Sequence, residues 1–232
     1  MKIAIVGNGN VACHLYKALK NKSEVKMVNS RTLKELPEDS DVILISVTDN
    51  SIEEVSKKIL PTDAIVAHTA GSVPMTILQG KKIGVFYPLQ TFTKGVELNY
   101  KEIPVFIEGS DPEVVQKLKE VAALFSQYVK EADSEVRKTL HLASVFACNF
   151  TNALAGVSED ILKDSGIDFS AILPLMRQTI NKLEKISPGE AQTGPAARGD
   201  SKVIETHLKM LESKPEYQEI YNQISNIIKN RK

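Results

Sequence analysis

The segment "GNGNVA" (residues 7–12) constrains the fold more than any other part of the sequence. It lies directly between an apolar run, Ile3–Val6, which is typical of a buried strand, and a helical pattern formed by Val11, Leu15 and Leu19. A glycine-rich turn between a strand and a helix is the setting that the G-x-G-x-x-G/A fingerprint requires. The opening of the chain therefore predicts the first βα unit of a doubly wound sheet.

The following hundred or so residues continue to alternate between short apolar runs and helical patterns. Further strands are predicted at Val25–Val28, Val42–Val47, Ala64–Ala67, Ile83–Phe86 and Pro104–Ile107, with a last edge strand at Tyr128–Val129. This alternation is typical of an α/β protein with a doubly wound, mostly parallel sheet.

After about residue 132 the strand patterns stop and only helical patterns remain. Ser134 is predicted to cap a long helix that runs to about Lys163, and a Gly/Pro-rich stretch interrupts the helices at 187–200. We therefore expect two domains, a sheet domain at 1–132 and an all-helical domain at 133–232.

Composition narrows the class of protein. Twenty-nine basic residues balance twenty-nine acidic ones, so nothing indicates a general affinity for nucleic acid or for an anionic membrane surface. No uninterrupted apolar run approaches the ~20 residues of a membrane helix, and the first residues do not resemble a secretory signal. The two cysteines, Cys13 and Cys148, show no metal-binding spacing and are expected to be reduced. These features favour a cytoplasmic protein without a metal site.

The glycine motif predicts how a dinucleotide would be held. Gly7 permits the tight turn, Gly9 lets the backbone approach a pyrophosphate, and Ala12 lets the helix pack closely on the strand. The unpaired N–H groups at the start of the helix attract an anion. The first part of the predicted cofactor site is Gly7, Asn8, Gly9, Asn10 and Val11. The alternative is a glycine-rich turn that binds no ligand.

The choice of cofactor depends on the residues that follow the second strand. An NAD site carries an acid about 20 residues beyond the motif, where it accepts the ribose 2′-hydroxyl. This chain has Asn29, Ser30 and Arg31 there, which can donate hydrogen bonds to a 2′-phosphate. NADP is therefore preferred, unless Arg31 is an ordinary surface arginine. Val47 and Thr48, after the third strand, complete the predicted site near the ribose.

Four further segments carry a resemblance to a known family: "HTAGS" (68–72), "FYPLQTF" (86–92), "HLASVFACNF" (141–150) and "GPAARGD" (194–200). Along its whole length the chain resembles Rossmann-like oxidoreductases that have a helical C-terminal domain of unassigned function. These are distant relatives of pyrroline-5-carboxylate reductase and of the deazaflavin-dependent NADP reductases. The resemblance implies an NADP-binding N-terminal domain, a helical domain that forms a homodimer, and a substrate cleft between the two. Members commonly have His before "PLQ", whereas this chain has Tyr87.

Three residues are candidates for catalysis. His68 ends a predicted strand and could titrate near neutrality, or it could anchor the loop that follows. His141 and Asn149 lie eight residues apart, on one stripe of an α-helix, and either face the cleft or are satisfied core residues. Related β-hydroxyacid dehydrogenases have a catalytic Lys four residues before the equivalent Asn, where this chain has Val145.

Four residues are candidates for contact with substrate. Tyr87 and Gln90 follow a strand end at the expected ligand-binding edge of the sheet. Arg198 and Asp200 could bind a carboxylate or phosphate, or could pair with each other while Asp200 caps the next helix.

Two classes of function remain open at this point. The first is an NADP-dependent oxidoreductase that transfers hydride to or from a small polar substrate, such as an imine, a keto acid or a hydroxy acid, in the cleft between the domains. The second is a non-catalytic NADP-binding sensor or partner protein. The missing lysine favours the second class, and the polar strand ends favour the first.

Overall fold

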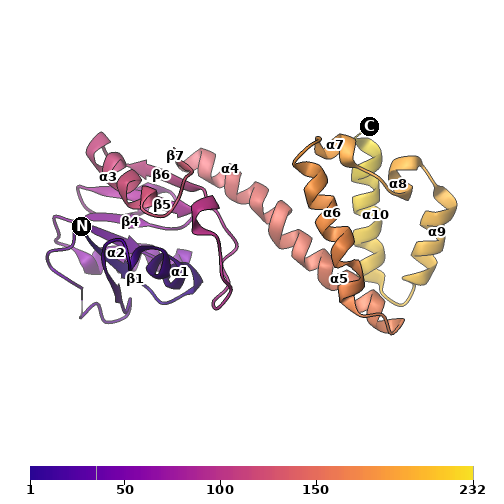
Figure 1. The fold of residues 1–232 in the computed structure, drawn as a ribbon, viewed down its shortest axis with the longest axis horizontal. Coiled ribbons are helices and arrows are strands. Elements are labelled where there is room, and N and C mark those ends of the chain that lie inside the picture. Colours follow the sequence, from indigo (N-terminus) through magenta and orange to yellow (C-terminus); the bar gives the residue numbers. More distant parts are fainter. Residues whose placement is uncertain (35, 232) are drawn as a thin grey trace. The chain divides into compact units, whose positions relative to one another are not determined.

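The computed structural model describes residues 1–34 and 36–231. The chain divides into two compact units, Met1–Asn149 and Phe150–Lys232, and the elements of both are labelled in Figure 1. The division expected from the sequence falls just before α4 (Ser134–Ser144), whereas α4 clusters with the first unit.

The first unit contains a seven-stranded sheet with the order β2-β1-β3-β4-β5-β6-β7. Every neighbouring pair is parallel except β5 and β6, which run antiparallel. The strands are β1 (Lys2–Val6), β2 (Glu24–Val28), β3 (Val42–Ile45), β4 (Ile65–His68), β5 (Ile83–Pro88), β6 (Val105–Gly109) and β7 (Val129–Glu131). The predicted fold class is confirmed, and the predicted strands differ from the observed ones only at their ends.

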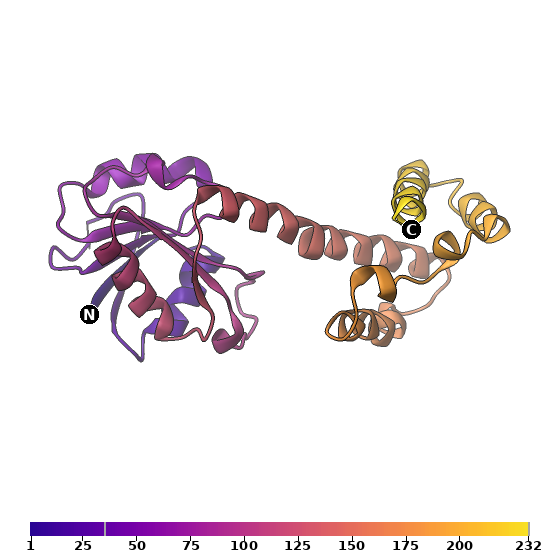
Figure 2. The ribbon, with the colours of Figure 1, turned by 90° about the horizontal axis from the view of Figure 1, so that it is seen from above.

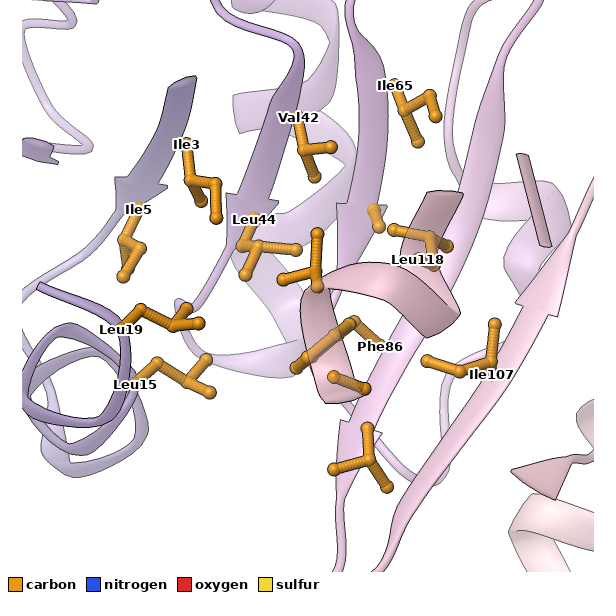
Figure 3. Close-up of a cluster of buried hydrophobic side chains, with 14 of the residues drawn as sticks. Ile3, Ile5, Leu15, Leu19, Val42, Leu44, Ile65, Phe86, Ile107 and Leu118 are labelled. Atoms are coloured by element: carbon orange, nitrogen blue, oxygen red, sulfur yellow. The ribbon is translucent and has the colours of Figure 1, made fainter. Parts of the chain in front are cut away.

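Three helices cover the two faces of this sheet. α1 (Asn10–Leu19) and α3 (Pro112–Ala123) pack on one face, and α2 (Ile52–Ile59) packs on the other (Figure 2). Figure 3 shows Leu15 and Leu19 of α1 and Leu118 of α3 among the sheet residues that they cover. Because each fully buried side chain of this size stabilises the fold by about 1.5–3 kcal/mol, both layers are held firmly.

The parallel arrangement determines where ligand-binding side chains can gather. β1, β2, β3, β4 and β5 all run in the same direction, so their carboxyl ends meet at one edge of the sheet. The residues next to these ends therefore come from distant parts of the sequence yet lie close together.

The long helix begins one residue earlier than the sequence predicts. The cap is Asp133, whose carboxylate accepts a hydrogen bond from the Val136 N–H at 2.8 Å, and Ser134 is the first helical residue. The Ser134 hydroxyl instead donates to the Glu108 carboxylate at 3.1 Å. A π-helical segment, Val145–Phe150, follows α4 in the sequence, and α5 (Thr151–Asp164) follows that segment.

The second unit is helical wherever it has regular structure, as predicted. After α5 it contains a 3₁₀ turn at Phe169–Ile172 and then α6 (Leu173–Leu183), α7 (Pro188–Ala191), α8 (Pro195–Arg198), α9 (Ser201–Met210) and α10 (Pro215–Asn230). Two short helices thus form within the Gly/Pro-rich stretch. A hydrogen bond of 2.9 Å between His207 Nδ1 and the Tyr221 hydroxyl joins α9 to α10.

One helical stretch, Ser134–Asp164, is long and apolar enough to cross a membrane when judged by length and composition alone. Its most apolar window has a mean hydropathy of 1.3 and is not buried within this chain. The sequence prediction counted only uninterrupted apolar runs and missed this stretch, in which small and polar residues separate the large apolar ones. A single helix of this kind is weak evidence for a membrane span, because helices of water-soluble proteins pass the same test.

Candidate functional site

A cavity of ≈ 610 Å³ lies at the carboxyl edge of the sheet, within the first unit. The structure gathers all ten predicted cofactor-binding residues around it: Gly7, Asn8, Gly9, Asn10, Val11, Asn29, Ser30, Arg31, Val47 and Thr48. Six further residues complete the lining: Ser46, Ser51, Glu54, Val55, Lys58 and Thr69. Strand ends and loops that are distant in sequence thus form one cavity, whose volume is typical of a ligand-binding pocket.

The ends of three strands approach each other so closely at position 7 that only glycine fits there. Its φ of +133° is unfavourable for side chains, and a Cβ atom there would lie 2.1 Å from the carbonyl oxygen of Ser46. The Gly7 N–H donates to the Val28 carbonyl at 2.9 Å, and the Ser46 N–H donates to the Val6 carbonyl at 2.8 Å. The turn is therefore held closely between β2 and β3, as the motif predicts.

The start of α1 is open to the cavity. Gly9 is the N-cap, no side chain caps the helix, and the first turn contains no acidic residue. A Cβ atom on Gly9 would meet nothing within 4 Å, so the space beside this backbone is free. The N–H groups and positive potential of the first turn can therefore face an anion such as a pyrophosphate. These residues fit a dinucleotide.

A short turn after β2 presents the predicted 2′-phosphate residues. The Arg31 N–H donates to the Asn29 side-chain oxygen at 2.9 Å, which fixes the turn. Ser30 is half-buried and Arg31 is exposed, and both line the cavity. The Thr48 and Ser51 hydroxyls, which also line the cavity, are 3.0 Å apart.

Two charged residues of the lining, Glu54 and Lys58, were missed by the sequence interpretation. Lys58 Nζ donates to Glu54 Oε1 at 2.5 Å. The acid expected in an NAD site follows β2, whereas the Glu54 carboxylate comes from α2. The helical spacing of Ser51, Glu54, Val55 and Lys58 could have shown that they share one face.

His68 lies next to the cavity residue Thr69 and is fully buried. The Ala70 N–H donates to His68 Nδ1 at 3.2 Å. This hydrogen bond anchors the loop after β4, which is the alternative role expected for His68. Burial, and then repulsion from Arg137, lowers the pKa of His68 to about 4. The expectation that His68 titrates near neutrality is therefore wrong, because the imidazole is uncharged at pH 7.

Arg137 of α4 is a second fully buried polar residue. Its guanidinium forms an ion pair with Glu108 of β6 and donates to the Val73 carbonyl at 2.9 Å and the Ala132 carbonyl at 3.4 Å. No local sequence pattern distinguishes Arg137 from a surface arginine. These contacts join α4, β6 and the loop after β4, and so hold the part of α4 that carries His141.

Tyr87 and His141 come together at the end of β5. The Tyr87 hydroxyl lies 3.3 Å from His141 Nδ1, and the rings are edge-on with centroids 6.4 Å apart. Tyr87 is 8% exposed, and burial raises the pKa of its hydroxyl. The phenol is therefore protonated at neutral pH and can donate. A Cβ atom on Gly71 would lie 2.6 Å from the tyrosine ring, so the loop after β4 packs tightly against it.

The remaining predicted residues are placed differently. Gln90 is exposed, and its side-chain oxygen accepts from the Thr91 N–H at 2.7 Å. Asn149 is exposed and lies in the π-helical segment rather than in regular α-helix.

Arg198 and Asp200 belong to the second unit. The Asp200 carboxylate caps α9 by accepting from the Val203 N–H at 3.4 Å, as the structural alternative predicts. Arg198 is exposed at the end of α8. Both residues are described, and no ion pair joins them. Across residues 1–34 and 36–231, no group of three His, Cys, Asp or Glu side chains is placed to hold a metal ion.

The sheet order, the glycine turn and the open helix start at the carboxyl edge define a Rossmann-type protein. The chain belongs to the family described as "Domain of unknown function (DUF2520)", which matches residues 103–228. No curated protein gives a significant match.

Solved structures agree with this family and fold. The chain is 38% identical to BF3122 of Bacteroides fragilis, named a "putative NADP oxidoreductase", with a TM-score of 0.92 over 99% of this chain and 98% of that one. Protein TM1727 of Thermotoga maritima is 24% identical, with a TM-score of 0.76 over 98% and 97%. Pyrroline carboxylate reductase of Plasmodium falciparum, solved with NADP bound, is 11% identical, with a TM-score of 0.62 over 99% and 100%. The predicted resemblance is therefore confirmed.

Proposed function

We propose that this protein is an NADP-dependent oxidoreductase that acts on a small polar substrate, such as an imine, a keto acid or a hydroxy acid. The cavity at the carboxyl edge of the sheet carries this proposal, because the Gly7 turn, the open start of α1 and Arg31 all line it. The names of BF3122 and of the NADP-bound reductase support the same class of reaction.

We assign each part of the cofactor to different residues of the cavity lining. Backbone N–H groups from Gly9 to Val11 would hold the pyrophosphate, and Thr48 would lie near a ribose. Ser30 and Arg31 would hold the 2′-phosphate that distinguishes NADP from NAD. When bound, the nicotinamide supplies or accepts a hydride, and the protein has to orient the substrate and exclude water.

Tyr87 and His141 are the pair that we assign to proton transfer. Reduction of a C=N or C=O bond adds a proton to the nitrogen or oxygen, and the protonated Tyr87 hydroxyl can donate it. His141 Nδ1, 3.3 Å away, is placed to exchange a proton with the phenol. His68 is uncharged and pairs with Val85 of the neighbouring strand β5, so we assign it to shaping the site. Asn149 remains a predicted catalytic residue, and Gln90, Arg198 and Asp200 remain predicted contacts of the substrate.

A second candidate is a protein that binds NADP without turnover. The specific observation in its favour is Val145, which occupies the position of the catalytic lysine in the related dehydrogenases. Single-turnover absorbance at the nicotinamide band, with a panel of imines and of keto and hydroxy acids, separates the two classes. Oxidation of NADPH or reduction of NADP by any compound supports the enzyme. Tight binding with no absorbance change across the whole panel supports the sensor.

Replacing Arg31 by alanine tests the cofactor assignment. Arg31→Ala should weaken NADP binding by about 10- to 100-fold, because a charge-assisted hydrogen bond is worth about 1.5–3 kcal/mol, and should barely change NAD binding. Titration calorimetry with both dinucleotides measures this difference. Arg177→Ala, an exposed arginine of the second unit, is the control. Equal losses for NADP and NAD would show that Arg31 does not touch the 2′-phosphate.

We also propose that the chain forms a homodimer through its helical part. The stretch Ser134–Asp164 exposes large apolar side chains, among them Val136 at 48% and Leu142 at 60%, which a water-soluble chain rarely leaves exposed in such number. The resemblance implies that a second copy of the chain covers them.

Sedimentation velocity at micromolar concentration should show a dimer, and Leu142→Asp should shift it toward the monomer. The substituted residue is exposed, so the monomer itself should remain folded. A wild-type chain that is only monomeric would remove the proposal. Co-sedimentation with phospholipid vesicles would instead assign this face to a membrane.

A further inference from the structure

Helix α2 carries two glutamate–lysine pairs with the same spacing but different surroundings. Lys57 Nζ donates to Glu53 Oε1 at 2.6 Å, and Lys58 Nζ donates to Glu54 Oε1 at 2.5 Å. Only the second pair lines the cavity at the carboxyl edge of the sheet. Exposed pairs of this kind contribute little to the stability of a helix, so stability alone does not distinguish them.

The position of the second pair follows from helical geometry. Ser51, Glu54, Val55 and Lys58 lie at spacings of three and four residues and form one face. Val55 is buried and fixes this face against the body of the unit, while Glu54 and Lys58 extend from it along the cavity wall. Glu53 and Lys57 are each one residue away, about 100° around the helix.

The charges around the cavity are few. Among the described residues of the lining, the cations are Arg31 and Lys58, and the anion is Glu54. A phosphate monoester carries a charge of about −1.5 to −2 at neutral pH, more than one guanidinium can balance. Lys58 supplies the second positive charge of this lining, and it forms an ion pair with Glu54.

We propose that the Glu54–Lys58 pair sets how strongly the site prefers NADP to NAD. Lys58 acts with Arg31 on the 2′-phosphate, and Glu54 opposes that phosphate by its own charge and by competing for Lys58. This inference rests on the proposed function, since it assigns two further residues to the same cofactor site. Although they form one ion pair, Lys58 would therefore raise the affinity for NADP and Glu54 would lower it.

The two opposite effects can be measured by titration calorimetry. The variants are Lys58→Met and Glu54→Gln, with Lys57→Met and Glu53→Gln as matched controls on the neighbouring face. The probes are NADP and NAD, together with 2′,5′-ADP and 5′-AMP, which differ from each other only in the 2′-phosphate.

Lys58→Met should weaken NADP and 2′,5′-ADP by about five- to tenfold and leave NAD and 5′-AMP unchanged. Glu54→Gln should strengthen the phosphorylated ligands by about two- to fivefold. Both effects should shrink between 50 and 500 mM salt, roughly as the Debye length does, because the side chains are 48% and 70% exposed. The two control variants should match the wild type.

The outcomes separate this inference from the proposed function. A wild-type chain that binds neither dinucleotide overturns both. Wild-type binding with a normal loss in Arg31→Ala, but with Lys58→Met indistinguishable from Lys57→Met, overturns the role of the pair alone. A Lys58→Met variant that loses NADP and NAD equally also overturns it, since the contact would then not involve the 2′-phosphate.

Discussion

Replacing Tyr87 by phenylalanine is expected to lower kcat by about 10²- to 10⁴-fold, the range typical for the loss of a positioned proton donor. The change removes only the hydroxyl, which lies 3.3 Å from His141 Nδ1. The ring remains and keeps its packing against Gly71, so the fold of the site should be preserved. NADP affinity should change little, because Tyr87 is absent from the cavity lining.

Steady-state turnover with the first substrate found in the absorbance panel measures this loss. Tyr128→Phe, at an exposed tyrosine, is the control. His141→Gln should also reduce kcat and should alter its pH profile, which a purely structural change would leave in place. An unchanged kcat in Tyr87→Phe would remove the phenol from the reaction.

Arg137→Met should lower the free energy of unfolding by about 3–5 kcal/mol, the usual cost of breaking a buried ion pair by removing one partner. The substitution leaves the Glu108 carboxylate without its cation and the Val73 and Ala132 carbonyls without their donor. Methionine fills much of the same volume, so the loss should come mainly from these unpaired polar groups rather than from a void.

Denaturant unfolding followed by circular dichroism measures this change. Lys138→Met is the matched control, because its ion pair with Glu135 is exposed and should be worth less than about 1 kcal/mol. The double variant Arg137→Met with Glu108→Gln should recover part of the loss. Equal destabilisation of Arg137→Met and Lys138→Met would show that the buried pair does not hold α4.

The sequence predicted the sheet well because each strand of the first unit has a local signature. Continuous apolar runs such as Val42–Ile45 are buried on both faces, and helical patterns lie between them. The gathering of the ten residues predicted to bind the cofactor around one cavity also follows from the sequence, since they lie close after strands whose carboxyl ends reach one common edge.

The parts that the sequence did not predict depend on contacts between distant residues. Arg137 looks like a surface residue in a helical pattern, and only the packing of α4 on β6 buries it beside Glu108. The neutral state of His68 likewise follows from burial, which local sequence does not give.

The π-helical segment was also unpredictable, because one wider turn leaves the apolar pattern almost unchanged.

The close packing of Gly71 on Tyr87 has a consequence for how this family can vary. Any side chain at position 71 would collide with the buried ring and displace the hydroxyl that meets His141. Homologues with tyrosine at position 87 should therefore keep glycine at position 71, whereas those with a smaller ring there are free to carry alanine. The two positions should covary although they lie on different strand ends.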